Sequence, residues 1–106
     1  MTLEPTRARL DEHRLLAEVT GMLREVTGED AAWAARVAAS SRIEGDLGLD
    51  SLEMAALGER LQLAYGELVD LPAFLAGLDI DQIIALTVGD LVGYVASAHP
   101  AAGTGR

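Results

Sequence analysis

One serine of this chain lies among carboxylates where a helix is expected to begin. Ser51 directly follows Asp50 and is followed two residues later by Glu53, within the stretch Asp46-Leu47-Gly48-Leu49-Asp50-Ser51-Leu52. Asp50 and Glu53 have the spacing of a helix capping box, which would leave the Ser51 hydroxyl free and outward on the first turn. A helix start favours a phosphate or phosphodiester, because its backbone N–H groups are unpaired and its dipole end is positive. Ser51 is therefore a candidate nucleophile, a candidate anchor for a phosphate-containing group, or simply part of a helix cap.

Catalysis by Ser51 itself is disfavoured by the lack of a suitable base. A nucleophilic serine needs a general base and a group that orients this base. The chain offers two histidines, His13 within an expected helix and His99 beside Pro100. Both are interpreted as ordinary surface residues. We therefore expect no catalytic residue and no enzyme.

The acidic residues around Ser51 do not form a recognisable metal site. Glu44, Asp46, Asp50 and Glu53 are close in sequence but lack the twelve-residue calcium-loop pattern with its central glycine and terminal glutamate. Magnesium often takes one or two carboxylates together with phosphate, so Asp50 could share a transient magnesium ion with a phosphate. We predict no stable metal site.

The composition indicates one small helical domain. The chain has 106 residues, half of them apolar and 4% aromatic, so its core must come from aliphatic residues that favour helices. It has no cysteine, which excludes disulfides and thiol chemistry. We find neither a signal peptide nor a stretch of about 20 apolar residues, the length of a membrane span. The expectation is a soluble cytoplasmic protein without a membrane partner, and a monomer.

The acidic charge is concentrated in the half that contains Ser51. The net charge is -9; residues 1–42 hold six arginines against seven acids, whereas residues 43–98 hold ten acids and only Arg60. Nucleic acid is disfavoured as a partner because phosphate binding needs clustered basic residues. Basic protein surfaces are the more natural partners, unless the acidic face only keeps the domain in solution.

Apolar spacing and capping residues predict an all-α fold. The expected elements are a helix over about 9–26, an extra short helix capped by Asp30, a main helix from Asp50 or Ser51 to Tyr65, two short pieces over 72–77 and 79–86, and a last helix from Thr87. Residues 1–8 and 99–106 are expected to be disordered. Gly58 is expected to permit a close backbone approach. The expected inward-facing residues are Leu15, Val19, Met22, Leu23, Val26, Met54, Leu57, Leu61, Tyr65, Phe74, Leu75, Ile80, Ile83, Ile84, Val88, Leu91, Val92 and Val95.

The motif around Ser51 closely resembles the attachment motif of acyl carrier proteins. The stretch Asp46 to Leu52 matches it in every position, the spacing of Leu57, Leu61 and Tyr65 matches the second helix of these carriers, and Thr87 to Val92 resembles the start of their last helix. The resemblance covers about residues 9–98. It implies a small four-helix bundle, here with a long first loop and the extra short helix.

The resemblance also implies a cofactor and partners. A phosphopantetheinyl transferase would join Ser51 to the 4'-phosphopantetheine of coenzyme A, with Asp50 helping to hold the transferase's magnesium. Acyl-loading, condensing or modifying enzymes would then act on acyl thioesters carried by the arm. The residues expected to contact partners are Leu49, Leu52, Glu53, Met54 and Arg60.

Departures from the family pattern point to a specialised carrier. Many carriers of fatty acid synthesis have acids along the second helix, where this chain has Ala56, Gln62 and Leu63. The segment between Tyr65 and Thr87 is longer than in compact carriers. This is the region in which acyl carriers often form a pocket for the acyl chain. A polyketide or other secondary-metabolite carrier is therefore favoured. The alternatives are a peptidyl or aminoacyl carrier and, from another class, an unmodified helical interaction module.

Overall fold

A computed structural model describes the backbone of residues 3–98 and the side chains of residues 12–98. Within this range the regular elements are all helices, and the predicted all-α fold is confirmed. The helices are α1 (Leu3–Thr27), α2 (Ala31–Ala35), α3 (Ser51–Tyr65), α4 (Leu71–Ala76), α5 (Ile80–Ala85) and α6 (Val88–Ala98). No helix in the described range is both long and apolar enough to cross a bilayer.

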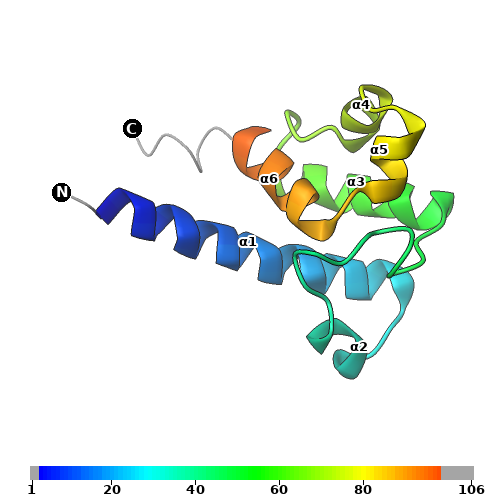
Figure 1. The fold of residues 1–106 in the computed structure, drawn as a ribbon, viewed down its shortest axis with the longest axis horizontal. Helices are drawn as coiled ribbons and strands as arrows, with labels where there is room; N and C mark the ends of the chain where they lie inside the picture. The colour runs from blue at the N-terminus through cyan, green and yellow to red at the C-terminus, as the bar shows by residue number, and fades with distance from the viewer. Residues whose placement is uncertain (1–2, 99–106) are drawn as a thin grey trace.

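The longest helix, α1, is the base on which the other elements assemble (Figure 1). It packs against α3 and α6 on one side and against α2 on the other, while α4 packs on α3. Two side-chain pairs join α1 to α3: Arg60 Nη1 lies 2.6 Å from Glu25 Oε1, and the Tyr65 hydroxyl donates to Glu18. Burial, and secondarily the bond to Glu18, raises the pKa of Tyr65 above its usual value. The second half of the helix that begins with Ser51 is thus tied to α1 by side-chain bonds.

The helix boundaries follow the capping residues. The Asp30 side chain accepts from the Trp33 N–H at 2.9 Å, so the extra short helix after Asp30 is confirmed. Before α6, Thr87 and Asp90 bond each other's backbone N–H groups at 3.1 Å. The helix α3 spans the predicted range and ends at Gly66, whose φ of 102° is costly for other residues. Local capping chemistry therefore sets where most of these helices start and stop.

Two boundaries differ from expectation. The backbone of residues 3–8 continues α1 instead of being disordered, because extending an existing helix adds one hydrogen bond per residue and Pro5 lies in the first turn, where it is tolerated. Leu71, just before the short piece expected over 72–77, opens α4 because Asp70 caps the helix and Pro72 lies in its first turn. The predicted disordered tail, residues 99–106, lies outside the described residues, as do residues 1–2 of the predicted disordered N-terminus.

The core confirms the stripes predicted for the three longer helices. The buried hydrophobic residues are Leu15, Val19, Leu23, Ile43, Leu49, Leu57, Leu61, Val69, Leu71, Leu86, Val88, Leu91, Val92 and Val95, with Met22, Val26, Met54, Tyr65, Phe74 and Leu75 packed partly buried around them. The inward placement predicted for Ile80 and Ile84 is wrong, since they are 68% and 48% exposed. The six-residue helix α5 can bury only a narrow strip, and partly buried Ile83 and buried Leu86 occupy it.

The link between α3 and α4, residues 66–70, is tied to α6 by one tyrosine. The Tyr94 hydroxyl accepts from the Asp70 N–H at 2.7 Å and lies 3.1 Å from the Asp70 carbonyl oxygen. Its ring stacks on Phe74 with centroids 4.3 Å apart. These contacts fix α4 over α3, where the Gly58 position lies close to Leu71: a Cβ on Gly58 would be 3.3 Å from the Leu71 Cβ. The expected close approach at Gly58 is therefore confirmed.

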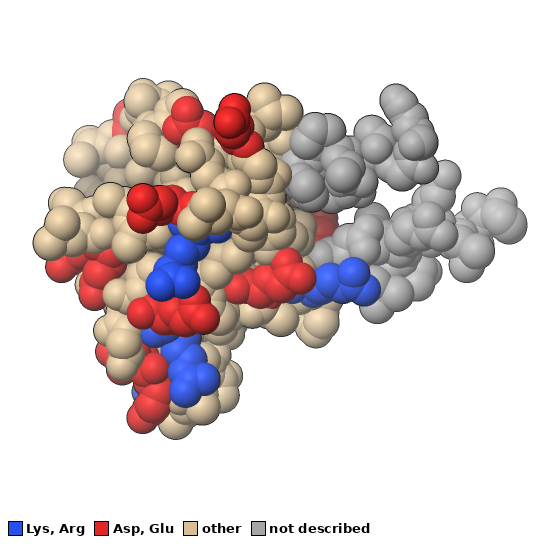
Figure 2. Space-filling model, turned by 180° about the vertical axis from the view of Figure 1, so that it is seen from behind, with Lys and Arg blue, Asp and Glu red and all other residues tan. Residues whose placement is uncertain are grey.

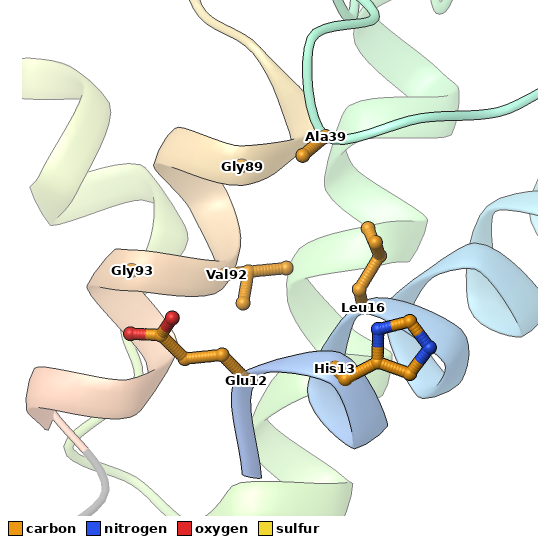
Figure 3. Close-up of a pocket in the computed structure, with 7 residues that line it drawn as sticks. All are labelled: Glu12, His13, Leu16, Ala39, Gly89, Val92 and Gly93. Carbon is orange, nitrogen blue, oxygen red and sulfur yellow. The ribbon is translucent and has the colours of Figure 1, made fainter. Parts of the chain in front are cut away.

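The segment before Ser51 is anchored on the start of α6. Three backbone bonds join them: Ile43 N–H to Leu86 O at 3.0 Å, Val88 N–H to Ser41 O at 2.9 Å, and Gly89 N–H to Ala39 O at 2.8 Å. Figure 3 shows Ala39 beside Gly89, with Gly93 about one turn further along α6. A Cβ on Gly89 would lie 3.0 Å from the Ala39 carbonyl oxygen, whereas one on Gly93 would meet nothing within 4 Å.

Replacing these two glycines by alanine should change stability in opposite directions. Gly93→Ala should raise the free energy of unfolding by about 0.5–1 kcal/mol, because alanine restricts the unfolded chain and favours the helix. Gly89→Ala should lower it, because the new methyl group forces the loop and helix apart. Urea denaturation of both variants checks this, and stabilisation by Gly89→Ala would contradict the described docking of the loop.

Candidate functional site

The loop that leads to Ser51 is folded around one carboxylate. Asp46 Oδ2 accepts from the Arg42 N–H at 2.8 Å, and the Arg42 guanidinium lies 3.4 Å from both Asp46 oxygens. In return, the Asp46 and Leu47 N–H groups donate to the Arg42 carbonyl oxygen at 3.0 Å. Gly48 then takes a φ of 72°, which turns the chain toward α3. The first three residues of the motif thus build a rigid turn.

Leu49 secures the end of this turn in the core. Its N–H donates to the Ile43 carbonyl oxygen at 3.2 Å, and its side chain is only 6% exposed. The prediction that Leu49 contacts partners at the surface does not fit this burial. An apolar side chain beside the start of α3 is more stable in the core than in water, and this anchoring determines the direction in which α3 leaves the loop.

Ser51 is the first residue of α3, and its side chain is exposed. The predicted capping box is present: the Glu53 N–H donates to Asp50 Oδ1 at 2.8 Å, and the Asp50 N–H donates to Glu53 Oε1 at 3.1 Å. Within the described range, no group hydrogen-bonds to the Ser51 hydroxyl. Because Asp50 and Glu53 satisfy the cap, the serine oxygen is left available to another molecule.

The other residues predicted to contact partners have different surroundings. Leu52, next to Ser51, is 81% exposed. Glu53 holds the cap, and Met54 is partly buried. Arg60 is exposed, but its guanidinium is paired with Glu25 of α1, a contact between residues 35 positions apart. Asp50, Ser51 and Leu52 therefore lie together at the surface. Arg60 instead forms an ion pair within the molecule, with Glu25.

Ser51 borders an apolar groove of about 490 Å³ between α3 and the α4–α5 region. Its walls are Leu49, Met54, Ala55, Leu71, Pro72, Leu75 and Ile83, with Glu44, Asp50 and Ser51 supplying the polar groups. Leu71, Pro72, Leu75 and Ile83 lie in the segment between Tyr65 and Thr87, which the resemblance to acyl carriers associates with a pocket. Ala55, on α3, was not predicted as a groove residue.

A second cleft of about 370 Å³ lies between α1, α6 and Ala39 (Figure 3). Glu12 and His13 border it, and it shares no lining residue with the groove beside Ser51. His99 lies outside the described residues. The structure therefore brings no described histidine to the groove beside Ser51. In the described part of the chain, no group of three histidine or acidic side chains is arranged to hold a metal ion.

Charges of both signs occur on the molecule, but not evenly. Figure 2 shows the face opposite to that of Figure 1, where basic side chains near the middle alternate with acidic ones and further acidic side chains lie around them. The pKa of the Asp46 carboxyl lies below its usual value of 3.8, mainly because the Arg42 backbone N–H donates to it and also because of the Arg42 guanidinium. Arg42, the arginine nearest in sequence to the Ser51 motif, is therefore paired with Asp46 of the loop. Glu44 and Asp50, beside the groove, are both exposed and form no described ion pair.

Comparisons of the chain with protein-family models, with curated proteins and with solved structures gave no match.

The Asp46 contacts should make the stability of the loop depend on pH. Because the folded pKa is lower than the unfolded one, the stabilisation is present above the usual value of 3.8 and is lost as the pH falls through the folded pKa. An NMR titration of the Asp46 carboxyl should show the low pKa. The protection factors of amides 42–49, which correct for the intrinsic dependence of exchange on pH, should fall at acid pH in the wild type and should already be lower at neutral pH in Asp46→Asn. An ordinary Asp46 pKa, with unchanged exchange in the variant, would contradict the described anchoring.

Proposed function

We propose that the chain is an acyl carrier protein that carries its cargo as a thioester on a 4'-phosphopantetheine arm attached to Ser51. The observation that carries the proposal is the state of the Ser51 hydroxyl, which is exposed and has no described hydrogen bond while Asp50 and Glu53 form the cap. The surrounding motif, from Asp46 to Leu52, is the one that resembles the attachment motif of acyl carrier proteins.

The residues around Ser51 fit such an arm. Ser51 supplies the oxygen that bonds to the phosphate, and the first turn of α3 offers backbone N–H groups and a positive dipole end to a phosphodiester. Asp50 uses Oδ1 for the cap, which leaves Oδ2 for a magnesium ion held by the transferase. The chain has no cysteine and therefore no thiol of its own. The arm would supply the thiol that forms thioesters.

The groove beside Ser51 suits an apolar cargo. It begins at the attachment residue, and most of its lining residues are aliphatic, from α3, α4 and α5. Burying apolar surface of an acyl chain there would be favourable by about 25 cal/mol per Å². The exposed face of α3 has Ala56, Gln62 and Leu63 where many fatty acid carriers have acids. These features support a carrier of polyketide or other secondary-metabolite biosynthesis.

The attachment is tested by intact mass spectrometry after incubation with coenzyme A and a broad-specificity phosphopantetheinyl transferase. Wild type should gain the mass of one phosphopantetheine, because the Ser51 hydroxyl is exposed and free of described bonds. Ser51→Ala should gain none, and Ser40→Ala, which changes another exposed serine, should behave as wild type. Absence of a gain on wild type, or an equal gain on Ser51→Ala, would sink the proposal. Loading assays with acyl and aminoacyl donors would then separate an acyl carrier from a peptidyl carrier.

Cargo binding in the groove should be visible by NMR. Attaching a medium-length acyl chain to the arm should shift the side-chain methyl signals of Leu75 and Ile83, which line the groove. The methyl signals of Val19 and Leu23, in the core on α1, should stay constant. Identical spectra of the free and acylated arm at Leu75 and Ile83 would show that the groove does not hold the cargo.

A further inference from the structure

The groove beside Ser51 has a polar end and an apolar end. Its polar lining residues, Glu44, Asp50 and Ser51, come from the loop before α3 or from the first turn of α3. The lining residues on α4 and α5, among them Leu75 and Ile83, are all apolar. Because the proposed arm is attached at Ser51, the part of a cargo nearest to the thioester would lie at the polar end. The far part of the cargo would lie between α3, α4 and α5.

The polar end of the groove carries negative charge without a basic group beside it. Glu44 and Asp50 are exposed acids, and among the described residues that line the groove none is basic. Arg42 and Arg60 are each paired with an acid outside the groove lining. The phosphodiester of an arm on Ser51 would add a further negative charge at this end. A cationic group on the cargo would therefore be attracted to the polar end of the groove.

Glu44 is the carboxylate at this end whose charge has no described partner. Asp50 uses its Oδ1 atom to cap α3. The main chain of Glu44 is held in the loop, because its carbonyl oxygen accepts from the Gly48 N–H at 3.1 Å. Its side chain, in contrast, forms no described hydrogen bond or ion pair. The backbone therefore fixes the place of Glu44 beside the groove and leaves its carboxylate available to a bound molecule.

We propose that Glu44 selects a cargo that has an amino group close to the thioester and is apolar elsewhere. This inference rests on the proposed function, because it names the class of cargo for the same groove. The protonated amine would pair with the Glu44 carboxylate, while the rest of the cargo would bury apolar surface against α4 and α5. An amine at the far end of the chain would instead have to enter the apolar end, where an unpaired charge is unfavourable. A cargo that ends in a carboxylate is disfavoured at both ends.

The test compares three cargoes of equal chain length, octanoyl, 3-aminooctanoyl and 8-aminooctanoyl, each joined to the arm through a stable amide. A broad-specificity transferase loads each arm from the matching coenzyme A analogue onto wild type, Glu44→Gln and Glu67→Gln. Glu67 is a matched control, because it is an exposed glutamate in the link before α4 and does not line the groove. The methyl signals of Leu75 and Ile83 report the equilibrium between cargo in the groove and cargo in solvent.

Glu44→Gln should lower the equilibrium constant for placing 3-aminooctanoyl in the groove about threefold, the size expected for an ion pair at an exposed side chain. The same variant should leave the equilibrium of octanoyl unchanged, because octanoyl has no charge. Glu67→Gln should match wild type for both cargoes. In wild type, 8-aminooctanoyl should occupy the groove less than 3-aminooctanoyl. Added salt should weaken the binding of 3-aminooctanoyl more in wild type than in Glu44→Gln.

The outcomes separate this proposal from the proposed function. Unchanged binding of 3-aminooctanoyl in Glu44→Gln, or an equal loss in Glu67→Gln, overturns the role of Glu44 while the carrier function stands. Stronger binding of 8-aminooctanoyl than of 3-aminooctanoyl in wild type overturns the placement of the amine. Methyl signals that no cargo shifts overturn the proposal and leave the attachment at Ser51 standing, whereas no transfer of an arm to wild type overturns both. Circular dichroism should show both variants folded, since each altered side chain is exposed.

Discussion

The reciprocal cap between Asp50 and Glu53 is the interaction on which the candidate site depends, because it fixes where α3 begins. It sets the first residue of α3, and therefore sets which residue stands on the exposed first turn. If α3 began one residue earlier or later, each of its side chains would be rotated by about 100° about the helix axis relative to the cap. Another side chain would then occupy the position of Ser51. The same cap satisfies the acidic side chains locally and leaves the serine oxygen unused.

Hydrogen bonds also hold the loop that precedes the cap. The Arg42–Asp46 contacts close the turn, and backbone bonds to the start of α6 hold the segment from Ala39 to Ile43 in place. Leu49 then enters the core beside α3. The motif around Ser51 is thus more than an attachment sequence. Its first four residues form the support, and its last three residues form the exposed end that this support presents.

Much of the fold could be predicted from local signals in the sequence. Asp30, Asp50, Asp79 and Thr87 cap their helices through side-chain contacts only three residues away, and such contacts can be recognised from spacing alone. The buried roles of Ile43 and Val69 could not be recognised in this way, because irregular backbone has no hydrophobic period. Periodicity also misplaced Ile80 and Ile84, since a helix of six residues is too short to define one face.

The candidate site shows the same division. The exposure of Ser51 follows from its place beside the cap, which the sequence makes visible. The pairing of Arg60 with Glu25 joins residues far apart in the chain, and the groove requires α4 to lie against Gly58, so both depend on the tertiary fold. The proposed function therefore combines a local motif that the sequence reveals with the geometry of a groove that only the structure reveals.

The central claim, that Ser51 is the attachment point, is tested most directly by locating the modification within the chain. Cleavage after arginine releases residues 43–60 as one peptide, and Ser51 is its only hydroxyl-bearing residue. Tandem mass spectrometry of the protein treated with coenzyme A and transferase should find one phosphopantetheine on this peptide. An unmodified 43–60 peptide, or the added group on any other peptide, would contradict the account.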